Sequence, residues 1–161
     1  MGQVDNVSVQ SVRLVVAGMM ALASSLLFVA LLFEDFSELA LADRSQLPWS
    51  LMFRYMIAMT FGGAIAGFLM SDMFGRQGIF GWFLALIGGG ITSIFAGVLG
   101  SFVGLVPDLL SSGWQPAMLI GVASGGLVLP FALVGWSALV VIWIAIVVVT
   151  HLKIRRRRLP H

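Results

Sequence analysis

Cysteine is absent from this chain of 161 residues, and charged residues are few. Without cysteine, the chain has no disulfide bond, no thiolate metal site and no cysteine nucleophile. Charged residues make up 10% of the chain, whereas ordinary soluble domains contain about 25%. A soluble fold of this length could not bury the 60% of residues that are hydrophobic. Together these features indicate a protein that lies within a membrane.

Four long segments carry no charged residue: 14–33, 55–71, 78–107 and 109–151. A helix needs roughly 20 mostly apolar residues to cross the hydrocarbon core of a bilayer. We therefore expect an all-α integral membrane protein, a four-transmembrane-helix bundle in which residues 1–161 form a single transmembrane domain. The expected spans are 11–33, 49–71, 79–106 and 117–150.

The cations divide unevenly between the two sides of such a bundle. If both termini are cytoplasmic, two cations, Arg44 and Arg54, lie outside. The other seven lie inside: Arg13, Arg76, Lys153, Arg155, Arg156, Arg157 and Arg158. An excess of Lys and Arg on the cytoplasmic side is the usual rule for membrane proteins. We therefore expect both termini in the cytoplasm, and the bacterial inner membrane as the location.

The last apolar stretch is too long for one ordinary span. A helix over residues 116–150 measures about 50 Å at about 1.5 Å per residue, against a core of about 30 Å. Pro130 lies within it, and its ring would clash with the carbonyl of Gly126. We expect a long fourth helix kinked near Pro130. The alternatives are that 109–126 is an interfacial or re-entrant segment, or that two half-length spans form a hairpin.

Small residues recur at four-residue spacing along the second, third and fourth expected helices. In lipid, helices associate through close backbone approach, and small residues permit it. We expect the second and third helices to form a tight hairpin against which the fourth packs; the alternative is that one small-residue face meets another protein chain. The expected packing or interface residues are Gly63, Gly67, Gly89, Ser93, Gly97, Gly100, Ser101, Gly104, Gly121 and Gly125.

Ionisable side chains are missing from the middle of every expected span. Transporters and channels usually carry such groups at membrane depth. We expect Arg54 to reach the membrane interface and pair with Asp43 or Glu38, and His151 to be a solvated interfacial residue rather than a haem ligand. The chain shows no catalytic or metal-binding motif. We therefore expect no enzyme activity, no catalytic residue, no metal site and no cofactor-binding residue, and we leave a bound lipid or pigment open.

The short polar segment between the second and third helices is expected to form a tight hairpin turn, with Asp72, Gly75 and Arg76 as its main residues. It resembles the cytoplasmic loop G-x-x-x-D-R-x-G-R-[RK] of major facilitator transporters. Gly67 precedes Asp72 by one residue more than in that pattern, and Met73 also departs from it. We interpret the resemblance as shared turn geometry and not as a sign of transport.

Five cations cluster near the end of the chain: Lys153, Arg155, Arg156, Arg157 and Arg158. Cations close to a membrane surface attract anionic headgroups, with about 1 kcal/mol from each. We expect these side chains to be lipid headgroup anchors. Nucleic acid is not an expected partner, because the cations are not spread over a soluble surface.

These features together predict a non-catalytic accessory or assembly subunit of a larger membrane protein complex, such as a respiratory or photosynthetic one. It would act by helix packing within the bilayer. Its expected partners are membrane lipids and other integral membrane subunits. The alternative is a small oligomeric transporter or channel lined by Gly, Ser and Thr of the third helix, including Thr92 and Ser93.

Overall fold

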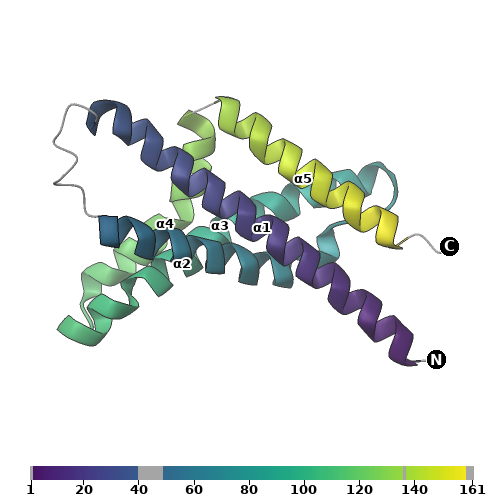
Figure 1. The fold of residues 1–161 in the computed structure, drawn as a ribbon, viewed down its shortest axis with the longest axis horizontal. Coiled ribbons are helices and arrows are strands. Elements are labelled where there is room, and N and C mark those ends of the chain that lie inside the picture. Colours follow the sequence, from purple (N-terminus) through teal and green to yellow (C-terminus); the bar gives the residue numbers. More distant parts are fainter. Residues whose placement is uncertain (1, 40–48, 136, 159–161) are drawn as a thin grey trace.

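The computed structural model describes residues 2–39, 49–135 and 137–158, and this part of the chain contains helices and no strand (Figure 1). The elements are α1 (Gly2–Leu39), α2 (Trp49–Leu69), the short 3-10 helix η2 (Ser71–Met73), α3 (Gly78–Ser112), α4 (Pro116–Gly135) and α5 (Ser137–Arg158). Four helical segments are long and apolar enough to cross a membrane: Gln10–Leu32, Trp49–Leu69, Gly78–Ser112 and Ala138–Arg158. The all-helical class and the number of candidate spans, four, agree with the sequence expectation.

Helix α2 lies between α1 and α3, and adjacent glycines explain how it contacts both. A Cβ on Gly63 would meet the side chain of Ser24 in α1, whereas a Cβ on Gly62 would meet the carbonyl of Ala96 in α3. Consecutive residues of a helix point about 100° apart. The two glycines thus allow close backbone approach on two sides of the same helix.

Helix α3 is longer than the expected span 79–106. It continues past Pro107 and ends at Ser112, so its 35 residues extend about 52 Å. Gly113 ends the helix in a left-handed conformation, with φ of 72°, and its N–H donates to the carbonyl of Leu109 at 3.0 Å. Glycine adopts a positive φ without steric cost, which suits it to this position. The proline inside the helix does not end it.

The last apolar stretch forms two helices rather than the single long helix that we expected. Helix α4 includes Pro130 and ends at Gly135, and α5 begins at Ser137 with a different direction (Figure 1). Glycine favours a helix end because its helix propensity is low. The fourth candidate span is Ala138–Arg158, which lies in α5. A bend at Pro130 stays a prediction.

Charged side chains gather at one end of the bundle. An oxygen of the Asp72 carboxylate in η2 lies 4.0 Å from Nη2 of Arg13, and the other oxygen lies 3.8 Å from Nη2 of Arg158. The part of α1 around Arg13, the turn after α2 and the end of α5 therefore lie together, on the side of the bundle where Figure 1 places the labels N and C. Arg54 and Asp108 pair where α2 begins and α3 nears its end.

Candidate functional site

The small-residue surface of α3 is covered by three other helices of the same chain. A Cβ on Gly89 would lie 2.7 Å from the side chain of Val147 in α5, and one on Gly100 would lie 2.9 Å from Cα of Met59 in α2. A Cβ on Gly104 would lie 2.5 Å from the ring of Tyr55, also in α2. The small-residue face of α3 therefore packs against α2, α4 and α5 of the same chain.

Helices α3 and α4 touch through their backbones. A Cβ on Gly97 would meet the carbonyl of Gly125, and a Cβ on Gly125 would meet the side chain of Ser101. Gly121, which we also expected to pack, is exposed and has only an ordinary contact with Leu105. The close contact between the two helices is therefore at the middle of α4, around Gly125 and Gly126.

The glycines expected in the α2–α3 hairpin are divided between two neighbours. Gly63 and Gly67 lie against Met20 of α1, and not against α3. Gly62, which sequence reasoning missed, takes the position next to α3. The signal that could have identified it was the pair Gly62-Gly63, because two adjacent glycines can serve two different helices.

Three hydroxyl groups of α3 lie in the packed interior: Thr92, Ser93 and Ser101. The Ser93 hydroxyl donates to the carbonyl of Gly89 at 2.9 Å and accepts from Nε1 of Trp143 at 3.1 Å. Trp143 is therefore a polar contact between α5 and α3 that sequence reasoning missed. A serine that bonds to the carbonyl four residues earlier is an ordinary helix feature.

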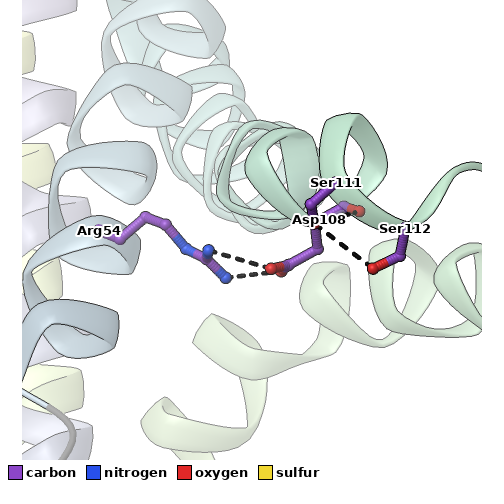
Figure 2. A network of polar contacts seen from close by, with 4 residues as sticks. All are labelled: Arg54, Asp108, Ser111 and Ser112. Atoms are coloured by element: carbon purple, nitrogen blue, oxygen red, sulfur yellow. Dashed lines mark hydrogen bonds and ion pairs between the residues drawn. The ribbon is translucent and has the colours of Figure 1, made fainter.

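Arg54 binds Asp108 in a two-pronged ion pair that joins α2 to α3 (Figure 2). Nη1 donates to Oδ1 at 3.3 Å and Nη2 donates to Oδ2 at 2.7 Å. Figure 2 also shows Ser111, whose hydroxyl donates to the Asp108 carbonyl at 3.2 Å. We expected Asp43 or Glu38 as the partner of Arg54; Asp43 and the side chain of Glu38 lie outside the described residues. The pair joins the first turns of α2 to the last turns of α3.

His151 is buried, with 0% of its surface exposed, so the expectation of a solvated histidine is wrong. The N–H of Gly75 donates to its Nδ1 at 3.2 Å, and its ring lies 4.4 Å from the ring of Trp82. A neutral imidazole that accepts at Nδ1 carries its proton on Nε2. Neither nitrogen then has a free lone pair for a metal or haem iron. His151 is buried because the side of α5 that carries it faces the turn between α2 and α3.

The turn residues Asp72, Gly75 and Arg76, which the sequence analysis identified, lie where η2, the start of α3 and the end of α5 meet. Gly75 has a φ of 78°, and a Cβ there would lie 2.5 Å from the side chain of Ile154 in α5. Nε of Arg76 donates to the carbonyl of Asp72 at 3.0 Å. Because positive φ and close approach both favour glycine, the turn is shaped to receive the end of α5.

The five tail cations do not share one environment. Arg158 donates to the carbonyl of Ser71 at 3.4 Å in addition to its ion pair with Asp72. Arg155 is half-buried. Lys153, Arg156 and Arg157 are exposed. The tail therefore combines attachment to the turn with a free cationic surface.

No protein-family model matches this chain, and neither do any of the curated proteins or solved structures compared with it. Within the described residues, no group of three or more His, Cys, Asp or Glu side chains could hold a metal ion. The candidate functional features are therefore the helix contacts, the turn that receives α5, and the exposed apolar and cationic surfaces.

Proposed function

We propose that this protein is a non-catalytic accessory or assembly subunit of a larger membrane protein complex, such as a respiratory or photosynthetic one. The observation that carries the proposal is the outer side of α4. Ile120 and Val134 are 72% and 83% exposed, and Leu119, Leu127 and Phe131 are exposed as well. Helix α4 contacts α3 through Gly125 and Gly126, and these five apolar side chains point away from the bundle.

This arrangement favours a partner on α4 rather than on the small-residue face of α3. The α3 face is already filled by the chain's own helices, and a second chain could reach it only by displacing them. The apolar side chains of α4 that the chain does not cover are available to a partner subunit. The transporter alternative receives no comparable support, because Thr92 and Ser93, the hydroxyls it would use, are buried in the packed interior.

The test is purification of the tagged protein in mild detergent, with mass spectrometry of co-purifying chains and an absorption spectrum. We expect stoichiometric membrane subunits with the wild type. Ile120→Trp and Val134→Trp should reduce their recovery at least about tenfold, because an indole that lipid accommodates clashes with a packed protein surface.

Ile57→Trp is the matched control, since Ile57 is also exposed but lies on α2. It should leave the recovered subunits unchanged. A wild-type protein that purifies without other membrane chains would contradict the proposal, and so would equal losses from all three variants.

We further propose that both termini are cytoplasmic and that the membrane is a bacterial inner membrane. The support is the charge distribution between the two ends of the bundle. Arg13, Asp72 and Arg158 lie together at one end, whereas Arg54 and Asp108 pair where α2 begins. The end that holds most of the cations is the one that the positive-inside rule places in the cytoplasm.

A further inference from the structure

The last turns of α5 form an open hollow on the outside of the bundle. Its volume is about 520 Å³, and it is lined by Val149, Leu152, Lys153, Arg156 and Arg157. These positions are spaced by three and four residues, so they share one side of the helix. The hollow thus has an apolar part and a cationic part.

The three cations of the hollow differ from the tail arginine that holds the turn. Arg158 is occupied by Asp72 and by the carbonyl of Ser71. Lys153, Arg156 and Arg157 are exposed and have no ion pair or hydrogen bond with any residue that the structure describes. Like charges within two turns of a helix repel one another. An anion bound among them would remove that repulsion.

The apolar part lies deeper in the candidate span than the cations. Val149 precedes Lys153 by four residues, or about 6 Å along the helix axis, and both lie within the span Ala138–Arg158. Val149 and Leu152 are 50% and 40% exposed. An acyl chain can therefore lie against these two residues while a phosphate lies among the cations.

We propose that this hollow is a binding site for an anionic glycerophospholipid. The phosphate contacts Lys153, Arg156 and Arg157, and the first part of an acyl chain contacts Val149 and Leu152. A small soluble phosphate compound would meet only the cations. The site is more specific than a general attraction of five tail charges to headgroups, because only three of the five contribute to it.

The experiment measures phosphatidylglycerol retained by the purified protein, by native mass spectrometry, during titration against phosphatidylcholine. In the variant K153Q/R156Q/R157Q we expect retention to weaken about a hundredfold. The control R76Q/R155Q/R158Q removes the same number of cations from the same end of the bundle and should retain the lipid. Equal losses in the two variants would show diffuse attraction and overturn the proposal.

A second variant keeps every charge and therefore leaves the positive-inside signal intact. Val149→Trp fills the apolar part of the hollow and should weaken phosphatidylglycerol retention about tenfold. Soluble glycerol phosphate should not displace the lipid. Displacement by it, or equal retention of phosphatidylcholine and phosphatidylglycerol by the wild type, would overturn the proposal.

Discussion

At the scale of single residues, two polar contacts join helices that are far apart in the sequence. Arg54 and Asp108 are 54 positions apart, and Gly75 and His151 are 76 positions apart. Both pairs lie near membrane ends, where polar groups keep strong partners because the surroundings are partly apolar. Each pair links the end of one element to another element, so each contributes to the geometry of the bundle as well as to its stability.

The contact between Gly75 and His151 leads to a residue-scale prediction. His151→Leu leaves the buried N–H of Gly75 without an acceptor and should lower the free energy of unfolding by about 1–3 kcal/mol. His151→Asn carries an oxygen near the position of Nδ1 and should lose less. The measurement is unfolding of the purified protein in mixed micelles, followed by circular dichroism. Equal stability of the wild type and the leucine variant would contradict the role given to this bond.

At the scale of elements, the fold depends on how closely the backbones of α2, α3 and α4 approach one another. In lipid, apolar side chains gain little by contacting one another instead of acyl chains. Close packing therefore supplies much of the free energy of helix association. The carbonyls of Ala96 and Gly125 lie where a Cβ on Gly62 and on Gly97 would project. A larger residue at either position must push two helices apart.

The element-scale prediction concerns Gly97 and a control on the same helix. Gly97→Leu should lower the free energy of unfolding by about 3 kcal/mol, because the side chain overlaps the backbone of α4. Gly90→Leu is the control: a Cβ at Gly90 meets nothing within 4 Å. It should be neutral or gain about 0.5–1 kcal/mol from helix propensity. Both are measured by the same micelle titration, and a Gly97 variant as stable as the Gly90 variant would refute the α3–α4 contact.

This placement also changes what a mutation at Gly97 can test. If the small-residue face met another protein chain, a bulky residue at Gly97 would test assembly of the complex. In the structure Gly97 lies against Gly125 of the same chain, so the substitution tests the fold of the monomer. The exposed positions of α4, such as Ile120 and Val134, are the informative ones for a partner.

At the scale of the whole molecule, the two ends of the bundle differ in charge and in the elements that the charged residues connect. At one end, Arg13 of α1 and Arg158 at the end of α5 both lie next to Asp72 in η2. The other end holds the Arg54–Asp108 pair and the connection from α3 to α4. This polarity is the basis of the orientation proposed above.

The absence of cysteine makes the orientation directly testable, because a single introduced cysteine is the only thiol. Ser112 and Gln77 are both exposed and lie at opposite ends of α3 or next to them. In intact cells, Ser112→Cys should react with a membrane-impermeant maleimide, whereas Gln77→Cys should react only after permeabilisation. The reverse pattern would place the termini outside. Labelling of both cysteines in intact cells would contradict a span between them.

The sequence by itself determined the membrane class and the helical fold class, because length, apolar runs and charge position are local properties. It could not determine how each helix is rotated about its axis. The helices are apolar on nearly all sides, so no polar stripe marks the inner face. Only the tertiary structure decided that Gly63 meets α1, that His151 is buried, and that Arg158 contacts Asp72 and the carbonyl of Ser71 while Arg156 does not. Those outcomes depend on contacts between residues far apart in the chain, which local composition does not encode.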